Sequence, residues 1–344
     1  RDRGCKYAQR ASCTSDVPSR PRADSAPTRP SLHATTTLGR GYESKIYLLR
    51  LHLWAALWVR VESYTRTTSG QFSLWDLVTK RQCWVETCGA SVLSVNYIAG
   101  KGLILSQLKD ARVLNPAFCQ LSPFNSLAEE MVPTLNSTCF AVADSKYGKV
   151  NIYDASLQKL ALNVSVEEPK SKGMCMCVQA CAGLSSATAH ILGGFEDGSV
   201  VLWDCRNPSR ELSSLKVFAE PVMCLDVDVT TRSGVCGSPL KTLEVFSVTQ
   251  DQFQLQKQYS VELRNPGVSS VKVRRDSKIM ASGGWDGRVR VFGFKKGKPL
   301  ALLNYHSATV NAVAFTPGCG TPAEHSNLLA CGSKDERISL WRLY

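Results

Sequence analysis

Alternating apolar and polar positions dominate the C-terminal half of the chain and recur as a unit. The segment GGFEDGSVVLWDC at 193–205 returns in varied form as SGGWDGRVRVFGF at 282–294 and as CGSKDERISLWRL at 331–343. In each copy small residues precede a turn with an Asp, and every second residue after the turn is apolar until an aromatic residue is reached. Small residues and Asp are typical of tight turns, and the period of two is typical of half-buried strands. Each copy is therefore predicted to be a strand, a turn and a second strand.

The aromatic residue that closes each copy measures the spacing of the units. It falls at Trp75, Tyr153, Trp203, Phe246, Phe292 and Trp341. From Tyr153 onward the steps are about 45 residues, a period typical of repeats that form radial arrays of small sheets. The step from Trp75 to Tyr153 is about two periods long, which indicates a degenerate unit hidden near Val113 and Leu114. Seven units are therefore expected.

Further strand-like runs flank the turns. Runs that open a unit lie at 221–228, 267–273 and 309–315, and runs that close one lie at 158–166, 253–261 and 299–305. Four short antiparallel strands per period form the blade of a β-propeller. The prediction is an all-β, seven-bladed propeller with degenerate blades one and two. Blade one is expected to be short of strands because only about 15 residues separate Val59 from Trp75. Blade two is expected to be degenerate because Asn115-Pro116 interrupts one of its strands.

These motifs resemble the WD-repeat proteins, and their order resembles one family among them. The stretches EDGSVVLWD, NPG, GWDGRVRVF and GSKDERISLW are similar to the family of guanine nucleotide-binding protein subunit beta-like protein 1, whose fungal relatives are the ASTRA-associated proteins. The resemblance is close over 167–344 and weak before it. It implies an adaptor of the co-chaperone assembly that matures phosphatidylinositol-3-kinase-related kinases, with the co-chaperone subunits and the kinase clients as partners.

Composition divides the chain into a tail and a folded domain. Residues 1–44 are rich in Ser, Thr, Pro, Ala and Arg, and they hold too few large apolar residues to offset the entropy of ordering. We expect a disordered basic tail at 1–44 and the propeller at 45–344. Because 44% of the 344 residues are hydrophobic, the chain can bury a substantial core.

The last blade predicts a strand from the N-terminal region. The chain reaches Tyr344 just after the third strand of blade seven, so its fourth strand is expected from the other end of the sequence, with 43–53 as the best candidate. The apolar segment 46–59 is too short to span a bilayer and is expected to be a buried strand. We expect no membrane partner. We expect a cytoplasmic location, or a nuclear one in addition.

Cysteines offer one candidate metal cluster. The chain has 14 Cys, and without a visible secretory signal we expect reduced thiols. Cys175, Cys177 and Cys181 could hold zinc or an iron–sulfur cluster. The alternative, which we favour, is that 174–178 opens a blade and that Cys175 and Cys177 are small buried residues of that strand. No metal and no cofactor are expected.

Net charge raises the possibility of nucleic-acid binding. The chain carries +12, and half of this excess lies in residues 1–50. The other basic residues are scattered, without an aromatic RNA-binding motif or a basic helix, and are interpreted as solvated strand edges. A nucleic-acid-associated protein that binds through its basic tail stays a less favoured alternative.

Histidine supplies the one tempting catalytic arrangement. None of the five His lies in a hydrolase or metalloprotease motif, and no phosphate-binding Gly-rich loop is present. His306 is predicted to lie near Asp335 and Ser333. The resemblance to WD repeats implies instead a structural network of a His, a turn Asp, a hydroxyl residue and the strand-end Trp, in which His306, Asp335 and Trp341 match three places. Trp203 is the strand-end residue of another blade, and Asp197 and Asp286 take the turn position in theirs. No catalytic residue is expected, and the protein is predicted not to be an enzyme.

What remains is a platform for protein partners. The turns with Phe195, Glu196, Trp285 and Lys334 and the inter-blade residue Glu220 are expected on the same face of the ring, where exposed aromatic and charged side chains are candidate contacts. Trp285 is the strongest candidate; its alternative is packing against the neighbouring blade. A G-protein gamma subunit is not expected, since four prolines and no heptads occupy 1–44. A generic scaffold, such as a substrate receptor of a ubiquitin ligase, stays open as an alternative.

Overall fold

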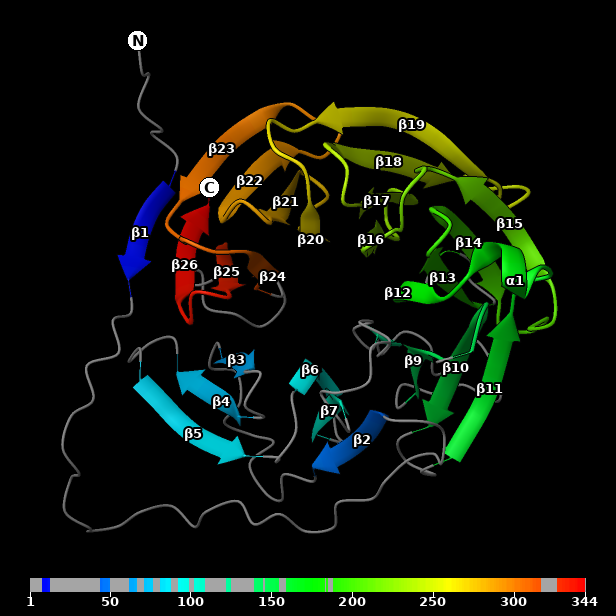
Figure 1. Ribbon diagram of the computed structural model, residues 1–344, viewed down its shortest axis with the longest axis horizontal. Helices are drawn as coiled ribbons and strands as arrows, with labels where there is room; N and C mark the ends of the chain where they lie inside the picture. The colour runs from blue at the N-terminus through cyan, green and yellow to red at the C-terminus, as the bar shows by residue number, and fades with distance from the viewer. Residues whose placement is uncertain are drawn as a thin grey trace.

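Seven antiparallel sheets are arranged radially around one axis in the computed structural model (Figure 1). The structure describes the backbone of 8–12, 44–49, 62–66, 71–76, 81–87, 92–98 and 102–108. It describes both backbone and side chains of 122–124, 139–144, 146–154, 159–182, 184, 188–316 and 327–343. The expected all-β, seven-bladed propeller is confirmed. We number the blades in chain order.

Blades three to six each contain four strands that run in chain order from the centre of the ring to its rim (Figure 1). Blade three consists of β8 (Ser122–Pro123), β9 (Cys139–Ala143), β10 (Lys149–Asp154) and β11 (Lys159–Ser165). Blade four consists of β12 (Cys175–Ala182), β13 (Ala189–Phe195), β14 (Ser199–Asp204) and β15 (Glu211–Lys216). Blade five consists of β16 (Cys224–Asp228), β17 (Ser233–Gly237), β18 (Thr242–Val248) and β19 (Leu255–Glu262). Blade six consists of β20 (Val268–Val273), β21 (Ile279–Gly284), β22 (Arg288–Gly293) and β23 (Pro299–Asn304).

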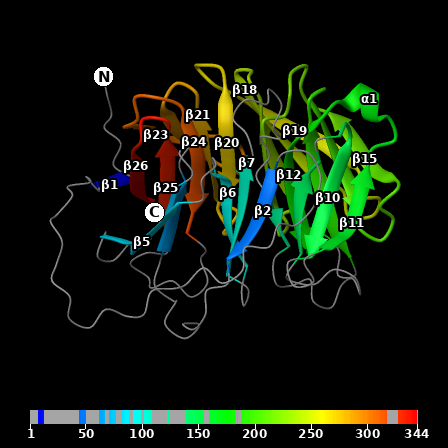
Figure 2. The same cartoon turned by 60° about the horizontal axis from the view of Figure 1, so that its bottom comes forward.

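The ring has two flat faces, and the strands run from one face to the other (Figure 2). One short helix, α1 (Pro169–Lys172), follows β11 and lies on one of the faces. It carries no buried residue, so it adds nothing to the core.

Blades one and two each show three described strands. Blade one consists of β3 (Glu62–Arg66), β4 (Gln71–Asp76) and β5 (Arg81–Thr87). Blade two consists of β6 (Val92–Ile98), β7 (Gly102–Leu108) and β2 (Ser44–Leu49), which pairs antiparallel with β7. In blades three to six the strand next along the chain takes this place beside the second strand, whereas here a strand from far upstream does. The predicted unit near Val113 and Leu114 lies outside the described residues.

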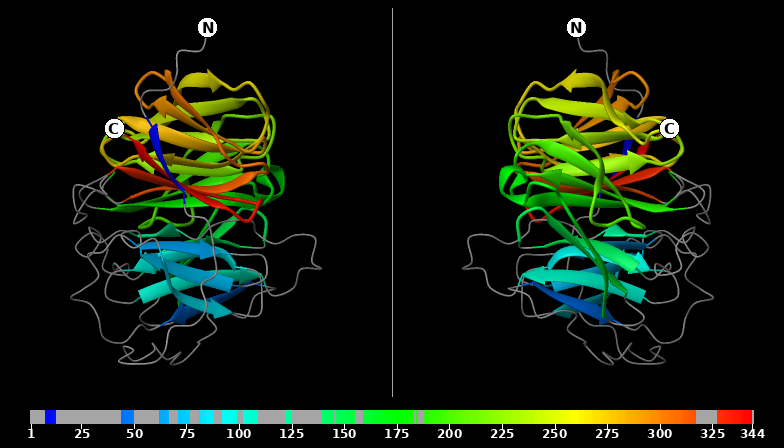
Figure 3. Two further views of the ribbon diagram at one scale, coloured as in Figure 1. Left: turned by 90° about the vertical axis from the view of Figure 1, so that its left-hand side faces the viewer. Right: turned by 90° about the vertical axis from the view of Figure 1, so that its right-hand side faces the viewer.

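Blade seven closes the ring with a strand from the N-terminal region, but not with the expected one. It consists of β24 (Val310–Phe315), β25 (Leu328–Ser333), β26 (Ile338–Leu343) and β1 (Ala8–Ser12), which pairs antiparallel with β26. Figure 3 shows β1 in blue beside β26 in red. The expected candidate 43–53 is wrong, because its residues 44–49 form β2 and pair in blade two.

The closing strand also lies within the segment for which composition predicts disorder. At residues 8–12 that expectation is wrong, because these five residues form a strand that pairs with the edge of β26. Most of 1–44 lies outside the described residues, and the domain boundary at 45 stays a prediction. Composition describes what a segment can do alone, whereas an unpaired sheet edge elsewhere in the fold can order it.

The aromatic markers Trp203, Phe292 and Trp341 each lie in the third strand of a blade and face the preceding blade. Trp203 of β14 shares a core cluster with Val150 and Ile152 of blade three. Phe292 packs with blade five. Trp341 packs with Val291 and its neighbours in blade six. The repeat visible in the sequence is therefore the repeat of one packing contact between blades, which explains why a large apolar residue recurs at that position.

Polar contacts near the centre of the ring link the first strands of neighbouring blades. Ser122 Oγ of β8 accepts a hydrogen bond from the Ala180 backbone N–H of β12. In the same way Asp226 of β16 accepts from Val273 N–H of β20, and Ser270 of β20 accepts from Val313 N–H of β24. Because these groups are shielded from water, the links satisfy buried donors and hold the register between blades.

Candidate interaction face

One face of the ring is built by the turns between second and third strands and by the loops that join consecutive blades. In three blades the first turn residue donates its backbone N–H to the carbonyl just before the first strand of the same blade. Glu196 donates to Met174 at 2.9 Å, Trp285 to Gly267 at 3.1 Å and Lys334 to Thr309 at 2.9 Å. Glu196, Trp285 and Lys334 therefore occupy equivalent positions. We call this side of the ring the turn face.

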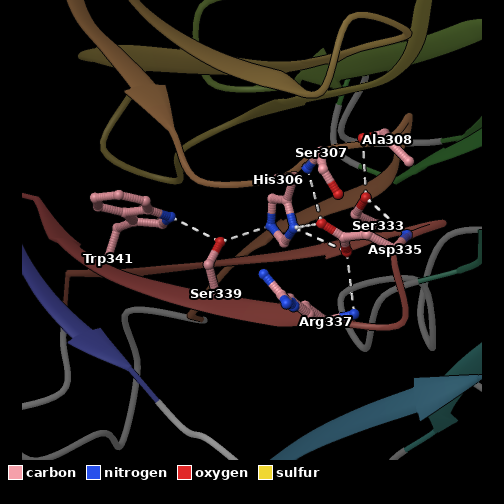
Figure 4. Close-up of polar contacts among 8 residues, drawn as sticks. All are labelled: His306, Ser307, Ala308, Ser333, Asp335, Arg337, Ser339 and Trp341. Atoms are coloured by element: carbon pink, nitrogen blue, oxygen red, sulfur yellow. Dashed lines mark hydrogen bonds and ion pairs between the residues drawn. The ribbon is translucent and has the colours of Figure 1, made fainter.

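Beneath the turn face, blade seven contains a continuous chain of hydrogen bonds (Figure 4). His306 Nδ1 lies 3.1 Å from Asp335 Oδ2, and His306 Nε2 lies 2.9 Å from Ser339 Oγ. Trp341 Nε1 donates to the same Ser339 Oγ at 2.8 Å. With the imidazole proton on Nδ1, each group has a partner: the ring donates to Asp335, and Ser339 donates to Nε2 while accepting from the indole. The structure thus brings His306, Asp335 and Trp341 together.

The hydroxyl member of this network is Ser339, a residue that the sequence reasoning missed. Ser333, the residue that the sequence predicts near His306, instead donates to the Ala308 carbonyl at 2.9 Å. A signal was present in the sequence, because Ser339 alternates with Ile338 and Leu340 and shares a face of β26 with Trp341.

Asp335 is held as a carboxylate. Burial alone would raise its pKa, but hydrogen bonds from the backbone N–H groups of Ser307 and Arg337 and from His306 outweigh burial and lower the pKa. These bonds measure 3.0 Å from Ser307 and 3.1 Å from Arg337. The carboxylate therefore ties the turn to the loop that enters blade seven.

The order Asp335, His306, Ser339 is the order of a hydrolase triad, so its chemistry has to be considered. A triad serine must reach a substrate, but Ser339 is 4% exposed and the His306 side chain 2%. The Ser339 oxygen also accepts a hydrogen bond from the indole, which occupies a lone pair that a nucleophile would use. The arrangement stabilises the blade and presents no reacting atom to solvent.

Blade six anchors the equivalent turn Asp with an arginine. Asp286 accepts the Arg288 backbone N–H at 3.2 Å, as Asp335 accepts that of Arg337. Arg290, four residues after the Asp as Ser339 is in blade seven, binds both carboxylate oxygens at 3.1 and 2.6 Å. Both side chains are largely buried, at 8% and 13% exposure. Burial alone would raise the pKa of Asp286, and the guanidinium bonds lower it. A bidentate ion pair thus replaces the histidine network.

Blade four uses a third arrangement. Asp197 accepts both the backbone N–H of Ser199 at 2.9 Å and its hydroxyl at 2.6 Å. Trp203 Nε1 donates across the blade boundary to the carbonyl of Ser165 at 3.1 Å. The three turn Asp residues therefore share the bond to the N–H two residues later, a common role for Asp in turns, and differ in what else they bind.

Phe195, predicted as a partner contact, is part of the core instead. Its side chain is fully buried and meets Trp203 edge to face, with ring centroids 5.9 Å apart. It is the last residue of β13, so it faces the neighbouring blade, whereas Glu196 begins the turn. The sequence placed both residues in one turn, and a shift of one residue along a strand reverses the side of the sheet.

The other predicted contacts differ in how free they are. Glu220 and Lys334 are exposed. Glu196 is exposed too, but its Oε2 accepts the backbone N–H of Met174 at 3.2 Å, so it also stabilises the loop into blade four.

Among the described residues, Trp285 is the largest exposed apolar residue of the turn face. It remains 44% exposed, although one side of its ring lies against Gly267, where an added Cβ would overlap the indole. The ring thus packs on the loop that enters its own blade and still presents a face to solvent, and its role as a partner contact stays a prediction.

Two further exposed apolar residues occupy turns of the same kind. Tyr147 in blade three is 55% exposed, and Leu240 in blade five is 37% exposed. Leu240 is close to Trp285, because its carbonyl accepts the N–H of Gly267, the residue beneath the indole, at 3.2 Å. Sequence reasoning missed both, although each stands in a turn where other blades have Asp. We call Leu240, Pro266 and Trp285 the Trp285 patch; Pro266 is exposed and directly precedes Gly267, which contacts the other two.

The cysteine cluster is built into β12. Cys175 Sγ lies 3.3 Å from the Cys177 carbonyl, Cys177 Sγ lies 3.4 Å from the Val222 carbonyl, and all three sulfurs are buried. Burial raises the pKa of Cys181 well above its usual range, which disfavours the thiolate that a metal needs. No group of three or more potential metal-binding side chains occurs among the described residues. The described helix is also neither long nor apolar enough to cross a membrane.

Comparison with known proteins agrees with the propeller fold and with the family that the sequence motifs resemble. The family model "WD domain, G-beta repeat" matches residues 256–293 and 297–342. The chain is 41% identical over 204 residues to guanine nucleotide-binding protein subunit beta-like protein 1 of Mus musculus, covering 59% of this chain and 60% of that protein. It is 51% identical over 85 residues to ASTRA-associated protein 1 of Schizosaccharomyces japonicus, covering 25% of this chain and 21% of that protein.

A third relative extends the match over more of the chain. The chain is 27% identical over 251 residues to ASTRA-associated protein 1 of Schizosaccharomyces pombe, covering 66% of this chain and 64% of that protein. The alignments thus span less than two thirds of the length of these relatives. WD40 repeats are shown, and the resemblance that the motif order indicated is confirmed.

Proposed function

We propose that this WD-repeat scaffold acts as a non-catalytic adaptor of the co-chaperone machinery that matures phosphatidylinositol-3-kinase-related kinases. The proposal rests on its similarity to guanine nucleotide-binding protein subunit beta-like protein 1 and to the ASTRA-associated proteins. The only arrangement of catalytic type that we found among the described residues, the His306 network, is shielded from solvent and serves to hold a blade. What such a ring can offer is surface for proteins.

The observation that carries the location of the contact is the Trp285 patch. Tryptophan buries a large area at low entropy cost and is enriched among the few residues that dominate binding energy. Here it lies beside exposed Leu240 and Pro266, which come from the neighbouring turn and loop. We propose that this patch is the centre of the contact with a co-chaperone subunit, with Glu196, Glu220 and Lys334 as polar contacts elsewhere on the turn face.

The test is recovery of partners from cells that express the tagged full chain. Co-chaperone subunits should be recovered with the natural protein, and Trp285→Ala should reduce their recovery at least about tenfold, the loss typical of a central hot-spot residue. Leu160→Ala is the matched control, since Leu160 is 49% exposed but lies on β11 at the rim. Its recovery of partners should match the natural protein. Thermal melting of each variant checks that the ring still folds.

The outcomes separate the function from the site. Absence of every co-chaperone subunit from the natural protein's partners would contradict the proposed function, and recovery of ubiquitin-ligase subunits in their place would favour a substrate receptor. Full recovery with Trp285→Ala would contradict the proposed contact while leaving the function standing.

A further inference from the structure

The rim of the ring is formed by the outermost strands of the blades, and one of them, β23, has no charged side chain to guard its edge. Exposed edge strands present unpaired backbone groups, and proteins commonly guard them with charged side chains. The outermost described strands β1, β2, β5, β11, β15 and β19 each contain at least one charged residue. The sequence of β23, PLALLN, contains none. It pairs with β22, and no other described strand pairs with it.

The exposed side chains of β23 are mainly apolar. Leu300 is 45% exposed and Leu302 is 48% exposed, whereas Leu303, which follows Leu302, is buried in the cluster between blades six and seven. Leu300 is the extra residue of a β-bulge, since Pro299 and Ala301 pair with the consecutive residues Phe292 and Val291, so the period of two does not assign it to the face of Leu302. The two leucines are both exposed on this outer strand. By contrast, the exposed residues of β19, on the neighbouring blade, are all polar: Gln256, Lys257, Gln258, Ser260 and Glu262. Exposed leucines on an outer strand without charged residues therefore distinguish blade six from blade five.

A basic turn leads directly into this strand. Lys295, Lys296 and Lys298 are exposed, and none of them forms an ion pair with a described residue. Gly297, with φ at 63°, permits the left-handed turn that presents them. The Tyr259 hydroxyl donates to the Phe294 carbonyl and so fastens the turn to blade five. Three unneutralised positive charges thus stand at a fixed place at the N-terminal end of β23.

We propose that β23 is a second interaction site, which binds an extended segment of a partner protein as a fifth, antiparallel strand of blade six. Main-chain hydrogen bonds along the free edge supply affinity, and side chains on alternate positions of the segment cover Leu300 and Leu302. In the antiparallel direction the C-terminal end of the segment lies beside the lysine turn. The segment that fits is therefore apolar at alternating positions and followed, not preceded, by acidic residues. This inference goes beyond the proposed function, because it concerns the rim and not the turn face.

Charge complementarity favours a partner segment over a second copy of the chain. Two copies of β23 paired with each other would bring no acidic residue to either lysine turn, because the strand has none. An acidic segment from another protein neutralises the turn and covers the leucines in a single contact.

Fluorescence anisotropy of the full chain with labelled synthetic peptides tests this site. The probe is a peptide of alternating Val and Thr followed by three Glu; the comparison peptide has the same composition with the three Glu at its N-terminal end. The natural protein should bind the first peptide at least about tenfold more tightly. Leu302→Lys should weaken binding at least about tenfold, because a charge replaces the apolar contact. Replacing the three lysines of the turn by Gln should abolish the preference between the two peptides, because it removes the positive charge without adding a negative one.

Leu160→Lys on β11 is the matched control, with the same chemical change at an equally exposed leucine of another outer strand. It should bind the first peptide as the natural protein does. Equal binding of the two peptides by the natural protein, unchanged binding by Leu302→Lys, or an equal loss in Leu160→Lys would overturn the proposal. Sedimentation at the working concentration completes the test: a dimer that Leu302→Lys dissociates would assign this edge to a second copy instead. Failure here would leave the partner recovery that depends on Trp285 unaffected.

Discussion

His190 should make the stability of the ring depend on pH between about 4 and 6.5. It is the second residue of β13, is 1% exposed, and stacks on Phe253 of blade five with ring centroids 4.9 Å apart. The guanidinium of Arg232 lies 5.1 Å from the same Phe253 ring. His190 Nδ1 has no hydrogen-bond partner among the described residues. A protonated imidazole at this position would carry an unpaired N–H and a charge out of water.

Burial is the main cause that lowers the pKa of His190 from 6.5 to about 4; Asp204 opposes the shift, and Arg206 and Arg232 add to it. Above pH 6.5 the imidazole is neutral in both the folded and the unfolded chain, so it costs nothing. Between pH 6.5 and about 4 the unfolded chain binds a proton that the folded chain does not, so stability falls as the pH falls. Because one pKa unit corresponds to about 1.4 kcal/mol, the full loss is about 3 kcal/mol.

Urea unfolding of the natural protein and of His190→Phe at pH 7 and pH 4.5 measures this effect. Phenylalanine keeps a flat ring against Phe253 but cannot bind a proton. The free energy of unfolding of the variant minus that of the natural protein should rise by about 2–3 kcal/mol on going to pH 4.5. Subtraction removes the contribution of the carboxylates, which titrate in both proteins. Phe253→Leu is the control, because it removes the stack and keeps the titrating ring. A difference between the two proteins that stays constant from pH 7 to pH 4.5 would refute the reasoning.

Three further outcomes are expected from urea or thermal unfolding. Ser339→Ala should lower the free energy of unfolding by about 1–3 kcal/mol, since it leaves an indole N–H and an imidazole nitrogen buried without a partner; an unchanged value would show that the network contributes nothing. Arg290→Met should cost about 3–5 kcal/mol because it strands a buried carboxylate, and adding Asp286→Ala should recover part of that loss; a larger loss in the double variant would contradict this account. Deleting residues 1–12 should lower the melting temperature by several degrees because the edge of β26 loses its partner, whereas deleting residues 1–7 should not.

Much of the architecture could be predicted because the repeat is local. The alternation and the aromatic marker predicted the strands around Trp203, Phe292 and Trp341, and each marker does lie in the third strand of a blade. Such patterns reflect contacts that every blade repeats, so each copy supports the next. The turn Asp was equally visible, because its bond to the N–H two residues later lies within the turn.

The candidate contacts could be predicted only in part. Phe195 and Trp285 stand in corresponding motifs, yet one is fully buried and the other 44% exposed. The difference in exposure depends on where the strand ends and on which loop packs against the side chain. The motif predicts neither of these. Leu300 and Leu302 read as ordinary strand residues until the structure showed that their strand is an outer edge.

The sequence by itself determined the number and kind of blades, because the alternation of apolar residues and the turn chemistry act over a few neighbouring positions and recur. Only the tertiary structure decided that Ala8–Ser12 closes the ring and that Ser44–Leu49 pairs in blade two. It also decided which of several similar apolar residues face water. These outcomes depend on pairing between segments far apart in the chain, where any strand of suitable length competes for the free edge and local pattern cannot choose among them.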